Sequence, residues 1–288
     1  MGEKLTSFFE QYMQKESFFK DKAVLLSGYK PEIMPHRDPE IEKIASILAP
    51  ALKLERPSNL FIYGTTGTGK TVVVNYITSN MTEIAQKANN NLKIYTINCK
   101  LKKVADTEYR LIADVARTMF NQEIPETGLS TNEVYKIFVN ALDKEKILLV
   151  MVLDEIDSLV DKIGDGLLYS LTRLNSELKN SQISIIGISN KLDFTDHMDA
   201  RVKSSLCEEE LQFFKYNAVQ ILDILKERVG VAFKEGKIAE GVLEKCAAYA
   251  ATHGDARRAI DLLRVSAELT ERKNENIISM QNIDEADE

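Results

Sequence analysis

Short apolar runs alternate with longer amphipathic stretches over residues 59–189 of the chain. A short run that is apolar at every position is typical of a strand buried on both faces of a parallel sheet. An apolar spacing of three and four residues predicts a helix instead. The alternation therefore predicts an α/β fold in which helices cover both faces of a parallel sheet.

The expected strands are residues 59–63, 92–98, 147–153 and 183–189. The expected helices are residues 40–52, 70–81, 107–120, 131–142 and 166–178. Residues 147–153 are apolar at every position, which indicates a central strand.

A change of pattern near residue 214 indicates a second domain. From Tyr216 onward the apolar runs stop, and amphipathic stretches follow at 217–229, 238–252 and 255–272. We expect an α/β domain over residues 1–214 and a small all-helical domain over residues 215–274. Residues 275–288 are acidic and carry little to bury, so we expect a frayed tail.

Composition narrows the class of protein. The 288 residues suit one large and one small domain, and 44% hydrophobic with 28% charged residues is ordinary globular usage. The three cysteines are far apart and lack C-x-x-C spacing, so neither a disulfide framework nor a zinc site is indicated. Neither a bilayer-spanning run nor a signal-peptide core is evident, which predicts a soluble, cytoplasmic protein with no membrane partner.

The formal net charge is −7, whereas a domain built mainly to grip nucleic acid is usually basic. Any contact with DNA must therefore be local.

Residues 64–71 match G-x-x-x-x-G-K-[ST] between a predicted strand and a predicted helix, the context that a phosphate-binding loop requires. Its glycines allow a tight turn whose N–H groups face an anion. Lys70 can reach the β- and γ-phosphates, and the Thr71 hydroxyl can ligate Mg²⁺. The alternative is a chance glycine-rich turn. The residues expected to contact ATP or ADP are Gly64, Thr66, Gly67, Thr68, Gly69, Lys70, Thr71 and Val72.

Asp154 and Glu155 follow the central strand, and Asn190 follows the next one. Ligands of open α/β sheets bind at the carboxyl ends of the strands, where the phosphate loop also opens. Asp154 would hold Mg²⁺, Glu155 would orient or deprotonate the attacking water, and Asn190 could hold that water or a phosphate oxygen. The ordinary alternatives are that Asp154 and Glu155 are acidic residues at the start of a helix, and that Asn190 is a turn residue.

In this order, the loop at 64–71, Asp154-Glu155, Asn190 and 254–258 resemble the Walker A, Walker B, sensor 1 and sensor 2 elements of AAA+ ATPases. Segments 35–37, 199–206, 216–217 and 254–263 are similar to archaeal origin-recognition replication initiators. The resemblance covers nearly the whole chain and implies a P-loop AAA+ sheet followed by a helical lid.

The resemblance implies roles that the residues alone would not. His36 and Arg37 would lie against the adenine, chiefly through their backbone, although a helix-entry turn is the alternative. Tyr216 and Arg228 would contact the nucleotide from the lid. Arg257 would be sensor 2, and Arg201 would be the arginine finger offered to a neighbouring subunit, which implies AAA+ self-association.

The family contacts duplex DNA through a helical insertion and a C-terminal winged helix. The insertion corresponds to residues 100–120, with Lys100, Lys102, Lys103 and Arg110 available for phosphates. A solvated loop is the alternative. The chain ends at Glu288, which leaves no room for a winged helix, so we expect a truncated or shortened member.

These observations predict a Mg²⁺-dependent ATPase that binds origin DNA. ATP binding and slow hydrolysis to ADP would act as a switch for recruiting the replicative helicase or related initiator subunits, in the cytoplasm at the nucleoid. A clamp-loader or helicase-loader ATPase is the alternative. A binding module without hydrolysis is a third reading, against which Glu155 argues.

Overall fold

The computed structural model describes residues 16–26, 28–100 and 105–287, together with Thr6, Phe9, Glu10 and Met13. The chain forms two compact units: Glu32–Lys215 is one, and Met1–Pro31 with Tyr216–Glu288 is the other. The chain therefore crosses between the units twice, after Pro31 and after Lys215. No helix in the described ranges is long and apolar enough to cross a membrane.

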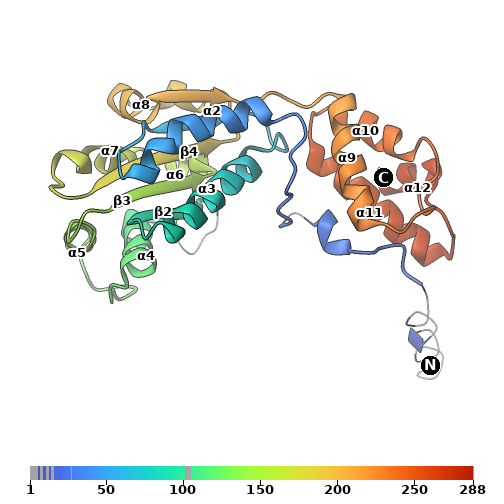
Figure 1. Ribbon diagram of the computed structural model, residues 1–288, viewed down its shortest axis with the longest axis horizontal. Helices are drawn as coiled ribbons and strands as arrows, with labels where there is room; N and C mark the ends of the chain where they lie inside the picture. Colours follow the sequence, from blue (N-terminus) through green and yellow to red (C-terminus); the bar gives the residue numbers. More distant parts are fainter. Residues whose placement is uncertain are drawn as a thin grey trace. The chain divides into compact units, whose positions relative to one another are not determined.

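A five-stranded, fully parallel sheet forms the centre of the first unit (Figure 1), in the order β2-β3-β4-β1-β5. Its strands are β1 (Leu60–Tyr63), β2 (Leu92–Asn98), β3 (Leu148–Asp154), β4 (Gln182–Ser189) and β5 (Glu209–Gln212). This confirms the predicted α/β fold. The prediction missed β5, because this edge strand is short, polar and partly exposed and so has no apolar run.

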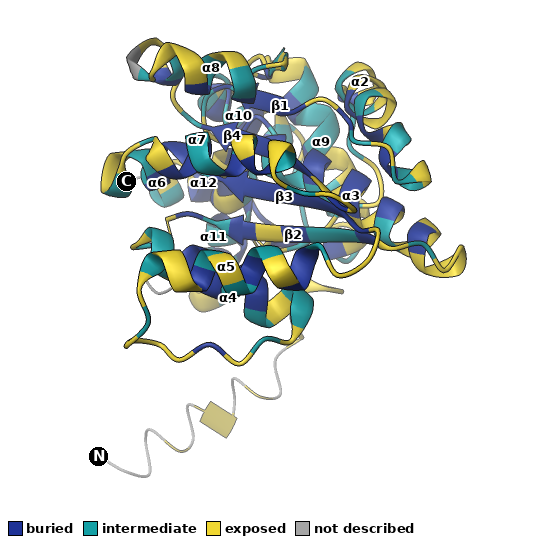
Figure 2. Cartoon of the chain, turned by 90° about the vertical axis from the view of Figure 1, so that its left-hand side faces the viewer, coloured by how far each residue is buried: buried dark blue, intermediate teal, exposed yellow. Residues whose placement is uncertain are grey.

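Helices cover both faces of this sheet, as the apolar residues 148–153 of β3 require (Figure 2). Alternate β3 residues Leu148, Val150 and Val152 pack with α2 (Asp38–Leu48) and α3 (Lys70–Lys87). Leu149, Met151 and Leu153 pack on the other face with helices that bury a second cluster. Those helices are α4 (Glu108–Phe120), α5 (Thr131–Leu142), α6 (Ile156–Ile163), α7 (Gly166–Arg173) and α8 (Ala200–Leu206).

Capping residues set the start of several helices where the sequence pattern placed them. Thr107 caps α4, and Ser130 forms a capping box with Glu133 at the start of α5. Two predicted helices end early. Residues 49–53 form the 3₁₀ turn η2 (Ala49–Lys53), in which Pro50 cannot donate a backbone hydrogen bond. Residues 174–176 form a second such turn, η3 (Leu174–Ser176).

The second unit is helical, with α9 (Ala218–Ala232), α10 (Val242–Ala251), α11 (Ala256–Lys273) and α12 (Met280–Asp287). The N-terminal segment completes its core, because Phe18, Phe19, Val24 and Leu25 are buried against these helices. The domain boundary predicted for residues 1–214 is therefore wrong at its N-terminal end.

The prediction of a frayed tail at 275–288 is also wrong. Ile278 and Ile283 are fully buried in the helical core, and the acidic side chains of α12 pair with basic residues of the same unit. Too few apolar residues mark this helix in the sequence, and the cations that pair with it lie earlier in the chain.

Candidate functional site

The phosphate loop joins the end of β1 to the start of α3. Gly67 and Gly69 have φ values of 77° and 92°, which favour glycine, and Gly69 stands at the N-cap of α3. Gly64 has a further constraint: a Cβ built on it would lie 2.4 Å from the carbonyl oxygen of Phe213. Glycine is therefore favoured at Gly67 and Gly69, and at Gly64 any Cβ would force the backbone to shift.

Lys70 is 4% exposed, and its ammonium turns back into the loop. Nζ donates to the carbonyl oxygens of Gly64 at 2.7 Å and Thr65 at 2.9 Å. A buried ammonium requires such acceptors, because burying the charge without a partner would carry a large desolvation cost. The positive charge is thus held at the loop before any anion arrives.

Asp154 and Thr71 face each other across the sheet edge. The Thr71 hydroxyl lies 3.1 Å from each carboxylate oxygen of Asp154, which is 7% exposed. Hydroxyl and carboxylate oxygens are ligands that Mg²⁺ accepts, with water and phosphate oxygens completing the shell. The two side chains fit a magnesium ion in chemistry and in proximity.

Glu155 occupies the N-cap of α6 with φ at 54°, a left-handed conformation that few non-glycine residues adopt. Its carboxylate is reached by the amide of Asn98 at 3.4 Å and by the ammonium of Lys100 at 3.7 Å. Asn98 also lies 3.4 Å from Asp154. The Asn98 amide thus lies within reach of both adjacent carboxylates.

Asn190 lies at the same edge because β4 is hydrogen-bonded between β3 and β1. Asp157 fixes the turn: its Oδ1 accepts from the Ser189 hydroxyl at 3.0 Å and from the backbone N–H of Asn190 at 3.3 Å. The sheet order thus brings together the ends of β1, β3 and β4, as the sequence predicted.

His36 and Arg37 precede α2. His36 is exposed and has φ at 63°. Arg37 is 4% exposed, and its side chain turns toward the phosphate loop, where Nε donates to the Thr68 carbonyl at 3.1 Å. Its guanidinium also donates to the Phe214 carbonyl at 2.8 Å. The side chain of Arg37, and not only its backbone, therefore contacts the phosphate loop.

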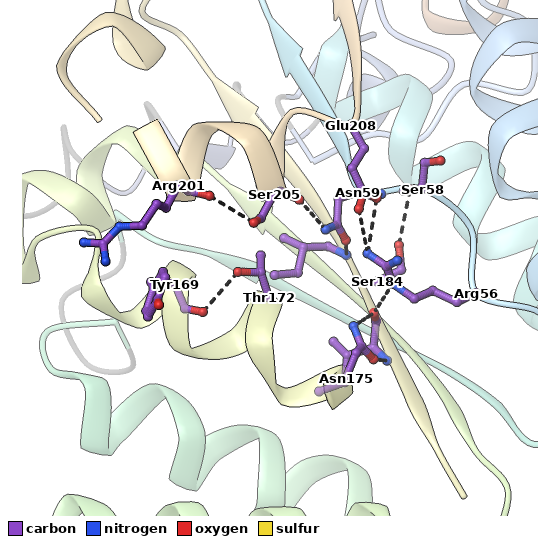
Figure 3. Close-up of polar contacts among 12 residues, drawn as sticks. Arg56, Ser58, Asn59, Tyr169, Thr172, Asn175, Ser184, Arg201, Ser205 and Glu208 are labelled. Carbon is purple, nitrogen blue, oxygen red and sulfur yellow. Dashed lines mark hydrogen bonds and ion pairs between the residues drawn. The ribbon is translucent and has the colours of Figure 1, made fainter. Parts of the chain in front are cut away.

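Arg201 lies in the first turn of α8, with its side chain 71% exposed (Figure 3). Asp199 holds the guanidinium through contacts of 3.0 and 3.1 Å, and the Tyr169 ring lies 5.2 Å from it. The hydrogen bond from Arg201 lowers the pKa of the Asp199 carboxyl to about 2. The side chain is thus exposed but oriented.

A polar network anchors α8 to the sheet. The buried Asn59 side chain accepts from the Ile185 amide of β4 at 2.8 Å and donates to the Ser205 carbonyl of α8 at 2.6 Å (Figure 3). The position of Arg201 is therefore fixed to the sheet through the end of its helix.

The helical unit holds the remaining predicted nucleotide contacts. Tyr216 is buried in the helical core, and Arg257 is exposed in the first turn of α11. The Arg228 guanidinium lies 4.4 Å from the centre of the Tyr29 ring. Burial lowers the pKa of Arg228. Arg258 instead pairs with Asp287 of α12 at 2.7 Å, a structural contact.

Two of the four cations expected to contact DNA are described. Lys100 and Arg110 are 74% and 50% exposed at their side chains, and Arg110 lies 3.6 Å from Asp106. Lys102 and Lys103 lie outside the described residues. Helix α4 buries Leu111, Ile112 and Val115 against the sheet, so only its outer face is available.

Two family models match the chain: an AAA domain over residues 53–194 and a Cdc6 AAA+ ATPase-type lid domain over residues 222–288. The ORC1-type DNA replication protein of Methanoregula boonei is 47% identical over 98% of this chain and 67% of its own length. That of Thermococcus onnurineus is 46% identical over 99% of this chain and 69% of its own length. The chain belongs to the ORC1-type DNA replication protein family.

The ORC1-type fold is also found among solved structures. The Aeropyrum pernix ORC1 protein in complex with DNA superimposes with a TM-score of 0.86 at 40% identity, covering 95% of this chain and 70% of that one. This ORC1-type chain thus spans about two thirds of the length of the relatives it matches.

Sequence reasoning missed Asn98 and Asp157 in this ORC1-type site, as well as the side-chain contacts of Arg37. Asn98 ends a predicted strand, so the edge rule that selected Asn190 applies to it equally. Asp157, in the first turn of α6, has the sequence signal of an ordinary acidic helix start. Its contact with the turn after β4 depends on strand order, which one sequence does not reveal.

Proposed function

We propose that this chain is an ATP-dependent replication initiator, in which ATP binding and slow hydrolysis to ADP form a conformational switch for helicase recruitment on origin DNA. One observation carries the proposal. The Thr71 hydroxyl lies 3.1 Å from both oxygens of Asp154, at the edge where Lys70 and Glu155 also lie. Family membership in the AAA+ ATPases supports the same chemistry.

The proposed roles follow from the chemistry of each group. Lys70 binds the β- and γ-phosphates, while Thr71 and Asp154 hold Mg²⁺. When bound, the ion would neutralise charge that develops on the phosphate oxygens. Glu155 orients or deprotonates the attacking water, and Asn190 holds that water or a γ-phosphate oxygen.

The remaining nucleotide contacts are proposed from the family resemblance. They are His36 and Arg37 at the adenine, chiefly through their backbone, Tyr216 and Arg228 from the lid, and Arg257 at the γ-phosphate. A guanidinium that touches the γ-phosphate would distinguish ATP from ADP and so set the state of the switch.

Duplex DNA is the proposed partner, because the Aeropyrum pernix relative was solved in complex with DNA. Lys100 and Arg110, with Lys102 and Lys103, would contact backbone phosphates. Few cations on a chain of net charge −7 predict weak, salt-sensitive binding. Related initiator subunits are proposed as further partners.

The exposed, oriented Arg201 favours a second function, that of a loader ATPase. A guanidinium supplied by one subunit to the nucleotide of another would make turnover depend on assembly. Turnover per subunit would then rise with protein concentration.

The two functions are separated by measuring binding of labelled duplex DNA with ATP, with ADP and without nucleotide over a salt series, alongside ATP hydrolysis. Nucleotide-dependent binding with slow turnover supports the initiator. No binding at any salt concentration, with turnover that rises steeply with protein concentration, supports the loader.

Two substitutions test the assigned chemistry. Lys70→Ala should abolish tight ATP binding, because it removes the cation held at the loop. Glu155→Gln should leave ATP affinity unchanged and lower turnover by about a hundredfold or more, since the amide cannot accept the proton of water. Nucleotide binding and steady-state hydrolysis are the measurements.

Lys87→Ala is the control for both variants, because Lys87 is an exposed lysine at the far end of the same helix. Hydrolysis at the wild-type rate by Glu155→Gln would show that another group activates the water.

A further inference from the structure

The Arg37 guanidinium joins three segments of the nucleotide-binding unit. Nε donates to the Thr68 carbonyl in the phosphate loop at 3.1 Å. Nη2 donates to the Phe214 carbonyl, after β5, at 2.8 Å. Nη1 binds the carboxylate of Glu40 in α2, and the Phe213 ring lies 5.0 Å from the guanidinium carbon. This set of acceptors suits the planar fork of donors of an arginine and cannot be matched by a lysine.

The contact with Thr68 bears directly on the phosphate loop. The carbonyl of Thr68 and the N–H of Gly69 belong to one planar, trans peptide unit, in which they point in opposite directions. Arg37 therefore fixes the direction of the Gly69 N–H by holding the carbonyl behind it. Gly69 is the N-cap of α3, where N–H groups bind anions.

The contact with Phe214 lies where the chain leaves the unit. Phe214 directly precedes Lys215, the last residue of Glu32–Lys215, and Arg37 lies shortly after its first residue. The Phe213 amide donates to the Tyr63 carbonyl at 2.8 Å, and the Phe213 carbonyl packs on Gly64. The exit segment, residues 213–215, thus contacts the phosphate loop both directly and through Arg37.

We propose that Arg37 is a positioning residue that couples the phosphate loop to the exit segment. Phosphate binding fixes the Gly69 N–H and with it the Thr68 carbonyl, and Arg37 passes this constraint to residues 213–215. The segment that leads into the helical unit after Lys215 therefore responds to phosphate bound at the loop. This inference rests on the proposed nucleotide binding at the loop.

The test is Arg37→Lys, which keeps the charge and the apolar stem but removes the fork. Two quantities are measured: the dissociation constants of ADP and ATP, and hydrogen exchange of amides 209–216 with and without ADP. We expect both nucleotides to bind about tenfold to a hundredfold more weakly, the size expected for a lost hydrogen bond to a charged group. We also expect ADP to slow exchange at 213–215 in the wild type but not in the variant, with exchange in β4 unchanged in both.

Arg56→Lys is the matched control. Arg56 also donates to a backbone carbonyl, that of Ile183 at 3.0 Å, and pairs with a carboxylate, that of Glu208. These contacts lie near the starts of β4 and β5, at the opposite end of the strands from the loop. Its substitution should change neither affinity nor the effect of ADP on exchange.

Wild-type affinity with wild-type protection of residues 213–215 in Arg37→Lys would overturn the inference and leave the proposed function standing. Failure of the wild-type chain to bind either nucleotide would instead overturn the proposed function. If Arg37→Lys does not fold, Glu40→Gln is measured instead. Gln keeps the size of the Glu40 side chain but removes the carboxylate charge that orients the Arg37 guanidinium. Reduced protection at 213–215 in that variant supports the coupling, and unchanged protection refutes it.

Discussion

Gly64 opens the phosphate loop, and its Cα lies against the backbone of Phe213. At the residue scale, this contact shows that a motif glycine has two roles. The motif requires flexibility and room near an anion, whereas the fold requires room for the exit segment of the same chain. The second requirement involves two residues far apart in sequence, so the motif alone cannot reveal it.

Gly64→Ala should lower the free energy of unfolding by about 1–3 kcal/mol, because a Cβ 2.4 Å from a backbone oxygen forces the backbone to shift. Urea denaturation measures the change. Gly166→Ala is the control, because Gly166 has open space around it at the start of α7. A Gly64→Ala variant as stable as the wild type would mean that the exit segment moves freely.

Helix α5 shows at the element scale how one carboxylate can fix a neighbouring connection. Asp143 caps the end of α5 and accepts from the amides of Lys179, Asn180 and Ser181 at 2.8–3.0 Å. Desolvation opposes ionisation of this carboxyl, but the amide hydrogen bonds outweigh it and hold its pKa below the ordinary 3.8. These hydrogen bonds thereby fix the segment that leads into β4.

Asp143→Asn should lower the free energy of unfolding by about 1 kcal/mol at neutral pH, through weaker hydrogen bonds to the three amides. Because the folded-state pKa lies below the unfolded one, this stabilisation is complete above about pH 4 and is lost as the pH falls through the lowered value. Urea denaturation over a pH series measures it.

Asp161→Asn is the control, because Asp161 forms an exposed ion pair with Lys191, of the kind that contributes little. A constant difference between wild type and Asp143→Asn down to the lowest pH would contradict the role of the charge.

At the scale of the whole molecule, residues 17–22 and the helices that follow Tyr216 pack in one unit. The Phe19 ring lies 5.0 Å from that of Phe233, and the Phe18 amide and the Ser17 hydroxyl donate to Glu271. Lys22 pairs with Glu268 of the same helix at 2.9 Å. The helical unit is therefore built from both ends of the chain, with the nucleotide-binding unit inserted between them.

Phe19→Ala should destabilise the helical unit by about 3–5 kcal/mol, because it leaves a cavity in a core that a single segment completes. Hydrogen exchange of the α9 and α11 amides reports this unit separately from the sheet. Leu26→Ala is the control, since Leu26 belongs to the same segment but is 51% exposed. Equal protection in Phe19→Ala and wild type would show that the helices fold without the N-terminal segment.

The sequence by itself determined the α/β class, the four apolar strands and the helices α3, α4, α5 and α7 between them, because periodicity is a local property. The short helix α6 was not among the expected helices. It also determined the phosphate loop and the ends of β3 and β4, since strand ends of a parallel sheet share one edge. Asn98 followed the same rule and was overlooked.

Only the tertiary structure decided the rest, because those features depend on residues that are distant in sequence. Strand order sets Asp157 against the turn after β4, and the path of β5 brings Phe213 and Phe214 to Gly64 and Arg37. The N-terminal segment and α12 join the helical core through side chains that carry no periodic signal of their own. Local pattern cannot specify which segment completes a core, because burial is a property of the assembled chain.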